Sequence, residues 1–583
     1  MATLDAQEDI QPPTAPVIHV HQDEIKEKDT EDLAKNLDAG ILVIEREEDD
    51  HDQNRSKVYQ TGWRLHALTA GLCVSLLLST LETTIVSTSL VSIVNSLQGF
   101  DRSGWVVTSY LLTYTGFLII FAKLSDIVGC KLLIMLSVSI FTIFSIACGF
   151  SSSMLSLIVL RAFQGLGGSG IYSLVSVMVP LMVPPAKYAT YIAIISSVFA
   201  ISSVLGPLLG GAITDNTTWR WVFYLNGPGG AIALFLLTVS VPLSFPYGEN
   251  VRFLNTLVSE RAWRRIDLFG AVSSLSASIL LVFALQQGGL VYPWTSGAII
   301  STFVLSGLLW IFFVLWQRWL SSLNGICEPM FPWRLAKNRF MLGLLLNAFL
   351  TGFTLMTSMI NIPQRLQTTN GTTAEEAGIR LLPLLLCSPI ATALAGLILT
   401  KIKLPPLYLL TMALILQTIG VGLFSSVDSS SLQVPAAQYG YQVIMGFGLG
   451  FNLSTLVMMV AVVVNQKDIA VAMGSVTQIR VLGGTIGLAI SSAILNNHIT
   501  AETSKILTRP QVEALLQSFQ TIKLFPPDTQ EEVRRIYGAG YSQQMRVMLY
   551  FCIVSFLSLA LLVERRPRRM ETTENGEIAE RTA

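Results

Sequence analysis

The stretch "SLLLSTLETTIVSTSL" runs from Ser75 to Leu90 and surrounds one acid, Glu82, with apolar and hydroxyl residues. It lies in an apolar run near 65–94, and a helix needs about 20 mainly apolar residues to cross a bilayer. An ionisable residue inside such a span is costly and is by default a candidate for function. The stretch therefore predicts a membrane protein with an acid near the middle of its first span.

The composition of the whole chain agrees with this interpretation. Of its 583 residues, 51% are hydrophobic and only 13% are charged, whereas soluble domains carry about 25% charged residues. The six cysteines and five histidines are scattered without metal-ligand spacing. The sequence also lacks a G-x-x-x-x-G-K-[ST] phosphate loop. We therefore expect no metal, no enzymatic activity, no nucleic-acid partner and no cofactor, and any uphill transport would have to draw on an ion gradient.

Apolar runs of spanning length recur about fourteen times and predict an all-α membrane protein. The runs lie near 65–94, 105–125, 131–150, 154–182, 189–213, 219–243, 267–287, 296–318, 339–363, 380–400, 405–426, 436–463, 469–496 and 546–563. Lys and Arg gather in the even-numbered loops, and this bias marks the cytoplasmic side. Both termini are therefore predicted to be cytoplasmic.

The segment "AKLSDIVGCK" (122–131) joins the second and third spans and contains Asp126, Gly129 and Lys131. Read from the residues alone, it is a charged cytoplasmic turn with Asp126 near a helix terminus.

The fourth span contains "LRAFQGLGGSG" (160–170), with Arg161 inside an apolar run. Its glycines satisfy G-x-G-x-x-G, but no strand precedes them, so a dinucleotide site is not indicated. Small residues at this spacing allow close helix packing. We expect Arg161 to face a cavity or a partner, with snorkelling to the cytosol as the alternative.

The fifth span contains "SSVLGPLLGGA" (202–212). Gly206, Pro207, Gly210 and Gly211 predict a kinked helix that a neighbouring helix can approach closely. It is followed by "WRWVFYLNGPGG" (219–230), whose tryptophans suit a membrane interface.

Further polar residues inside the spans are candidates for lining a transport cavity: Tyr110, Gln164, Asn347, Gln442, Asn452, Gln478 and Arg480. For Tyr110, Asn347, Gln442 and Asn452, each taken singly, ordinary hydrogen bonding between helices is the favoured interpretation. Gln478 and Arg480 belong to "TQIRVLGGTIGLA" (477–489) in the thirteenth span.

Together these segments resemble the major facilitator superfamily, and within it the fourteen-span drug:proton antiporters, including fungal multidrug and toxin efflux pumps. The matching patterns are G-x-L-(S/A)-D-x-x-G-R-K, with Ala122 and Cys130 as departures, R-x-x-Q-G-x-G-G, G-P-x-x-G-G, W-R-W-x-F-x-x-N-x-P and L-D-x-T-I-V, with Glu82 in place of Asp. The resemblance implies proton coupling by Glu82 and Arg161. It also implies a conformational latch at 126–131 and antiport through the Gly206–Gly211 motif.

A buried carboxylate without a cation is more stable when protonated, which suits a residue that picks up and releases a proton. The rival interpretation of Glu82 is a structural acid that is hydrogen-bonded to Thr83 or Ser79.

The resemblance implies two six-helix bundles with two inserted central helices. The predicted parts are a disordered acidic cytoplasmic tail (1–62), an N-terminal bundle (63–243), a cytoplasmic linker (244–266), the inserted helices with their loop (267–338), a C-terminal bundle (339–563) with an extracellular loop (497–545), and a cytoplasmic tail (564–583). Asp267 is expected to cap the first inserted helix.

The leading functional hypothesis is a proton-coupled exporter of small, largely apolar drugs, toxins or secondary metabolites. The alternatives are a carrier of siderophores or basic amino acids, and a membrane receptor or scaffold that transports nothing. We expect a monomer in the lipid bilayer of the plasma membrane, with the vacuolar membrane as the alternative. Of the N-x-[ST] sequons, Asn370 and then Asn216 are the expected glycosylation sites.

Overall fold

The computed structural model describes residues 62–241 except 184, and residues 267–564 except 290, 324–326, 328, 428–432 and 465–468. Almost all of the predicted acidic tail, the whole of the predicted cytoplasmic linker and the last nineteen residues lie outside the described part. Within the described residues the chain is helical and forms no β-strand. Fourteen helical segments there are long and apolar enough to cross a membrane, which confirms the predicted all-α membrane fold.

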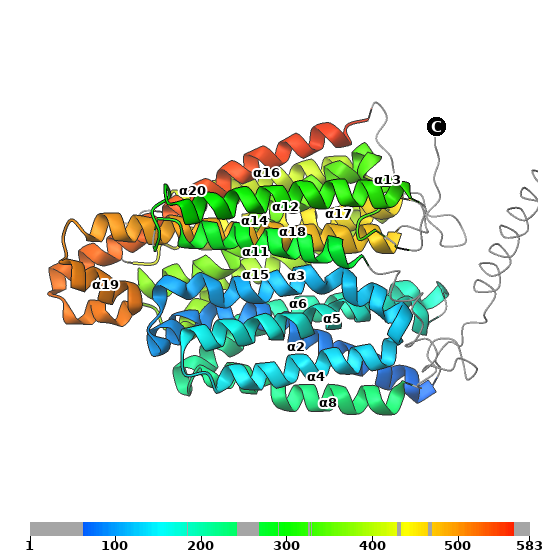
Figure 1. The fold of residues 1–583 in the computed structure, drawn as a ribbon, viewed down its shortest axis with the longest axis horizontal. Coiled ribbons are helices and arrows are strands. Elements are labelled where there is room, and N and C mark those ends of the chain that lie inside the picture. Colours follow the sequence, from blue (N-terminus) through cyan, green and yellow to red (C-terminus); the bar gives the residue numbers. More distant parts are fainter. Residues whose placement is uncertain are drawn as a thin grey trace, which may run out of the picture. The chain divides into compact units, whose positions relative to one another are not determined.

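The first six spanning segments form the N-terminal bundle (Figure 1). They are α2 (Gly62–Leu97), α3 (Ser103–Val128), α4 (Cys130–Gly149), α5 (Met154–Met182), α6 (Pro185–Asn216), and the short α7 (Arg220–Tyr224) continued by α8 (Asn226–Ser240). Helix α2 packs against α6 and α8, and α5 packs between α3 and α4.

The last six spanning segments form the C-terminal bundle. They are α14 (Arg339–Thr368), α15 (Ala374–Leu397), α16 (Pro406–Ser425), α17 (Ala437–Val463), α18 (Ile469–Thr503) and α20 (Pro527–Leu562). Helix α14 packs against α18 and α20, and α17 packs against α15 and α16. The two bundles meet where α6 contacts α15, where α3 contacts α18 and where α2 contacts α14.

The two inserted helices, α11 (Leu268–Gln287) and α12 (Gly297–Ser322), pack against each other, and α11 also contacts α3 and α18. The predicted cap of α11 is confirmed, because Asp267 accepts a hydrogen bond from Gly270 N at 2.7 Å. Its carboxylate also accepts from Trp316 Nε1 at 2.8 Å and Gln317 Nε2 at 2.5 Å. Asp267 thus ties the beginning of α11 to the end of α12.

The region 497–545 differs from the predicted loop. Helix α18 continues to Thr503, α19 (Arg509–Gln517) and a 3₁₀ turn η4 (Phe519–Leu524) follow, and α20 already begins at Pro527. Hydropathy identifies only the apolar part of a helix, so polar extensions of α18 and α20 read as loop. Exposed helical pairs such as Arg535–Glu531, 2.7 Å apart, each add about 0.3 kcal/mol to the stability of these extensions.

We call the end of the bundles that carries the odd-numbered loops the outer end, and the opposite end the inner end. By the predicted topology the inner end faces the cytoplasm.

Candidate functional site

The acid near the middle of the first span lies deep inside the N-terminal bundle. Glu82 on α2 is 0% exposed, and its Oε1 forms an ion pair with Nη1 of Arg161 on α5, which is 1% exposed. Its second oxygen, Oε2, accepts a hydrogen bond from Asn226 Nδ2 on α8 at 2.7 Å. Sequence alone placed no base beside Glu82, but the fold brings one from 79 positions away.

The rest of the Arg161 guanidinium is also held inside the bundle. Nε donates to Val106 O at 3.0 Å, and Nη1 donates to Gln164 Oε1 at 3.0 Å. The guanidinium carbon lies 4.6 Å from the centre of the Tyr110 ring, a cation–π contact. Arg161 therefore has partners in the bundle interior and does not snorkel. Tyr110 and Gln164, which were expected in the transport cavity, contact this ion pair.

The hydroxyls proposed as alternative partners of Glu82 bond elsewhere. Thr83 Oγ1 donates to Thr80 O at 2.7 Å, and Ser79 Oγ donates to Gly168 O at 3.3 Å. Two amide atoms near the carboxylate are buried without a hydrogen-bond partner, Gln164 Nε2 and Asn226 Oδ1. A buried amide atom without a partner is costly, so this cluster has spare hydrogen-bonding capacity.

The glycines of α6 bring that helix against α2 close to Glu82. A Cβ added at Gly206 would collide with Thr84, and one added at Gly210 would lie 2.5 Å from Thr88 Oγ1. Thr84 is only two residues after Glu82 on α2. A displacement of α2 around Glu82 must therefore move α6 as well, because the two helices have no space between them at these positions.

The opposite face of the same motif contacts the C-terminal bundle. A Cβ added at Gly211 would meet the backbone of Ala374 and Glu375 on α15. In return, a Cβ added at Gly378 would lie 2.5 Å from Pro207 O. The motif thus packs one face of α6 against α2 of the N-terminal bundle and the opposite face against α15 of the C-terminal bundle.

Hydrogen bonds close the outer end between the bundles. Asp215, at the end of α6, accepts from Glu375 N at 2.7 Å and from Ala374 N at 3.3 Å, at the beginning of α15. Asn496 on α18 donates to Asp101 O at 3.2 Å. The sequence analysis did not identify these residues. Their only signal is that Asp215 is an acid directly after an apolar span.

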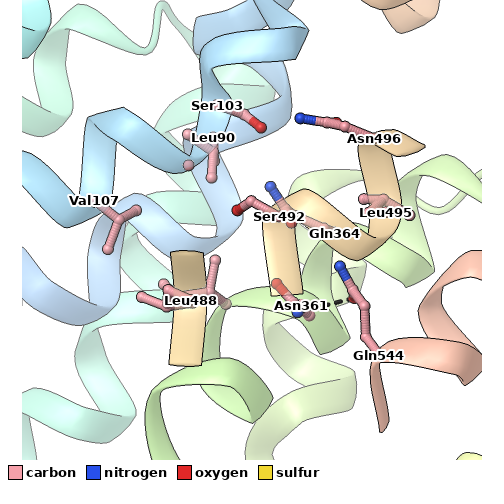
Figure 2. A pocket seen from close by; sticks show the side chains of 12 residues that line it. Leu90, Ser103, Val107, Asn361, Gln364, Leu488, Ser492, Leu495, Asn496 and Gln544 are labelled. Carbon is pink, nitrogen blue, oxygen red and sulfur yellow. Dashed lines mark hydrogen bonds between the residues drawn. The ribbon is translucent and has the colours of Figure 1, made fainter. Parts of the chain in front are cut away.

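Below this closure lies a small polar pocket between α2, α3, α14, α18 and α20 (Figure 2). Asn361 donates to Gln544 Oε1 at 2.9 Å and to Ser491 Oγ at 2.6 Å. The cavity volume is only about 10 Å³, about the minimum that holds a water molecule. The outer half of the protein is therefore sealed here.

The loop between α3 and α4 has the turn that its motif predicts. Gly129 has φ of 88°, a value that favours glycine. Lys131 Nζ donates to Thr238 O at 3.2 Å and to Val241 O, at the end of α8. Cations stabilise the carboxyl ends of helices. The side chain of Asp126 lies outside the described part of the chain.

The cavity candidates of the C-terminal half separate into two groups. Asn347 and Asn452 are buried within the bundle, where Asn452 Nδ2 donates to Asn347 Oδ1 at 2.9 Å and Asn347 Nδ2 to Ser558 Oγ at 2.9 Å. Gln442 is also fully buried, and neither of its amide atoms has a hydrogen-bond partner. These residues lie in the helix packing of the C-terminal bundle.

Gln478 and Arg480 on α18 instead face the N-terminal bundle. Gln478 Nε2 donates to Thr115 O on α3 at 3.0 Å. Arg480, two positions further along α18, lies near Tyr114 on α3 and Tyr172 on α5. Of the seven candidates, Gln478 forms a hydrogen bond across the boundary between the bundles, and Arg480 lies on the same helix near that boundary.

A much larger apolar cavity of about 850 Å³ adjoins this boundary. It lies between the inserted helices and the inner halves of α3, α14 and α18, and Gln478 is one of its few polar lining residues. Its volume is in the range of sites for drug-sized molecules.

The sequence profile described as Major Facilitator Superfamily matches residues 72–488 of the chain. The "MFS-type transporter FPY5" of Fusarium mangiferae is 65% identical over 88% of this chain and 86% of its own length. "Efflux pump aunC" of Aspergillus niger is 30% identical, covering 87% of each chain. "Multidrug resistance protein 3" of Bacillus subtilis is also 30% identical, over 86% of this chain and 95% of its own.

Solved structures show the same fold. A bacterial homologue of the human lysosomal transporter Spinster, in an inward-facing and unoccupied conformation, matches with a TM-score of 0.60 and 15% identity. The match covers 86% of this chain and 98% of that structure.

Proposed function

The chain belongs to the major facilitator superfamily, and from this premise we propose that it is a proton-coupled exporter of small, largely apolar molecules. The observation that carries the proposal is the Glu82–Arg161 ion pair, buried beside the closely packed α2–α6 contact. The names of relatives at 30% identity, which are efflux pumps and a multidrug resistance protein, support the export direction.

The proton would bind to the carboxylate of Glu82. Protonation removes the negative charge that compensates Arg161, and a buried cation without its partner is strongly unfavourable. Asn226 can adapt to either form of Glu82, because its amide offers a donor to the carboxylate and an acceptor, Oδ1, to the protonated acid. The change in charge therefore acts mainly on the contact between α2 and α5.

Coupling to transport would follow the packing of α2, α6 and α15. A shift of α2 moves α6 through the Gly206 and Gly210 contacts, and α6 holds α15 through Gly211, Gly378 and Asp215. Separation of α6 from α15 opens the outer end. Proton binding and outer opening would then be two properties of the same conformational state, as alternating access requires.

Substrate contacts are proposed at the boundary between the bundles, from Gln478 and Arg480 together with Tyr114 and Tyr172. Tyr110 and Gln164 would serve the proton site, and Asn347, Asn452 and Gln442 the packing of the C-terminal bundle. The protein would act as a monomer in the plasma membrane, with the vacuolar membrane as the alternative. Asn370 is the proposed glycosylation site, ahead of Asn216.

The test compares dye accumulation in yeast cells that produce the wild-type protein, Glu82→Gln, or the control Glu531→Gln, which removes an exposed carboxylate. The dyes are uncharged Nile red, cationic rhodamine 6G and anionic fluorescein. We expect the wild type and the control to lower accumulation of at least one dye, and a protonophore or Glu82→Gln to abolish this effect. Equal export by Glu82→Gln, or export of none of the dyes by the wild type, contradicts the proposal.

A further inference from the structure

Arg480 is a cation of the interior for which the described part of the protein supplies no anion. Its side chain is half-buried, and its Nη1 atom is covered yet has no hydrogen-bond partner. The acids that are buried among the described residues are already used, because Glu82 pairs with Arg161 and Asp267 binds donors at α11 and α12. An unpaired charge in a membrane span is costly and usually serves a function.

Snorkelling does not explain this arginine. Arg480 lies about 16 Å along α18 from Ile469, where the helix begins at the inner end. That is farther than an arginine side chain reaches, so its charge stays at the depth of the bundle interior.

Aromatic residues of the N-terminal bundle lie near Arg480, because α18 packs against α3 and Gln478, two positions before Arg480, donates to Thr115 O beside Tyr114. The rings of Tyr114 and Tyr172 lie 6.2 Å apart, and Tyr172 packs edge-on against Phe199 at 5.8 Å. Tyr114 also stacks on Tyr110 at 5.8 Å. An arginine on one bundle therefore lies near a row of aromatic rings on the other bundle.

We propose that Arg480, Tyr114 and Tyr172 form a binding site for an apolar, ring-containing molecule that carries one acidic group, such as a carboxylate, enolate or sulfonate. The anion takes the free donors of the guanidinium, and the phenol hydroxyls add hydrogen bonds. The rings of the ligand pack against the tyrosines. This inference rests on the proposed transport function, which it narrows from apolar molecules to apolar acids.

Because the site joins residues of both bundles, the ligand is held only while they are close together at α3, α5 and α18. Separation of the bundles on the inner side would move Arg480 away from the tyrosines, and the ligand would lose part of its binding site. Arg480 is therefore placed to determine specificity and to sense the conformational state.

The test uses two fluorescent probes with the same aromatic skeleton, 1-anilinonaphthalene-8-sulfonate and the uncharged N-phenyl-1-naphthylamine. Both are titrated into the purified protein in lipid nanodiscs. The variants are Arg480→Gln, Arg480→Lys and the control Arg546→Gln, which removes the same charge from an exposed position on α20. The signal of empty nanodiscs is subtracted, since both probes also enter lipid.

We expect Arg480→Gln to weaken binding of the sulfonate about ten-fold or more, as a lost charge-assisted hydrogen bond does. Binding of the uncharged probe should change less than about two-fold. Arg480→Lys should retain most of the sulfonate affinity, and Arg546→Gln all of it. An equal loss for both probes, an unchanged sulfonate affinity, or a wild type that prefers the uncharged probe overturns the inference.

Binding requires no proton gradient, so this result is independent of whether Glu82 couples transport to protons. A protein that binds the sulfonate through Arg480 but fails the export test would keep this inference and lose the proposed function.

Discussion

Substitution of Asp215 by alanine tests the closure of the outer end, because this carboxylate links the end of α6 to the beginning of α15. The change removes two hydrogen bonds across the bundles, at 2.7 Å to Glu375 N and 3.3 Å to Ala374 N, and a negative charge at a helix N-terminus. A buried charged acceptor with two such bonds would contribute several kcal/mol, but Asp215 is exposed and water competes with it. We therefore expect the closed state to lose about 1 kcal/mol, which shifts the opening equilibrium about five-fold.

The assay measures access to Ser492, which faces the closed pocket in Figure 2. Ser492→Cys is introduced after replacement of the six native cysteines, and labelling by a membrane-impermeant maleimide is followed in intact cells. We expect Asp215→Ala to raise the labelling rate about five-fold, in proportion to the open population. The matched control is Asp528→Ala, an exposed acid at the outer end, in the first turn of α20. An unchanged or slower rate in Asp215→Ala would refute the role of this carboxylate in closure.

Three further predictions concern packing, stability and sidedness. Gly378→Ala places a methyl group 2.5 Å from Pro207 O, so α6 and α15 must separate, which costs the closed state about 1–3 kcal/mol. The substitution should therefore speed labelling of Ser492→Cys, and slower labelling would contradict this prediction. Asp267→Ala leaves buried donors without an acceptor, which lowers the free energy of unfolding by about 2–4 kcal/mol. The Tm in detergent should fall by several degrees. An unchanged Tm would show that water takes the place of the carboxylate. Asn370→Gln should abolish an enzymatic deglycosylation shift on gels, and a shift that persists would place the glycan elsewhere.

The fold could be predicted because the bilayer requires one simple pattern, a long apolar run for each span. The fourteen runs correspond to the fourteen segments of the structure. The pattern fails where a helix leaves the apolar layer, as at the beginning of α20. An average over the apolar run also passes over the break between α7 and α8, although Asn226, Gly227 and Pro228 follow directly after it in the sequence.

The candidate site could be predicted only residue by residue. Sequence identified Glu82 and Arg161 as unusual, because each is a charge within an apolar run. It could not show that they pair with each other, since their contact depends on how α2 and α5 pack. The same limit explains why Tyr110 and Gln164 were expected in the cavity. An intramembrane polar residue faces something polar, and only the fold decides whether that is a substrate or a neighbouring side chain.

The role of Asp215 could not be predicted from the sequence for a different reason. An acid at the end of a span is common and by itself indicates only an interface with water. Its role arises because α15 begins directly opposite. The backbone N–H groups of Ala374 and Glu375 have no partner within the helix and donate to Asp215 instead. A contact of this kind belongs to one conformational state, and a single sequence describes all states at once.

The proton that Glu82 would carry and the charge of the molecule that Arg480 would bind together determine how much charge crosses the membrane in each transport cycle. This net charge sets how strongly a membrane potential drives transport. If one proton enters for each uncharged molecule exported, one positive charge moves inward per cycle, and 100 mV contributes about 2.3 kcal/mol. If the molecule is the singly charged acid that Arg480 would bind, its exit adds a second charge movement, and the same potential contributes about 4.6 kcal/mol. The substrate gradient that 100 mV can sustain then rises from about 50-fold to over about 2,000-fold. Import of the same acid together with one proton would move no net charge and would ignore the potential. The voltage dependence of the flux, measured in vesicles clamped with potassium and valinomycin, thus distinguishes export of the acid from its import and from export of an uncharged molecule.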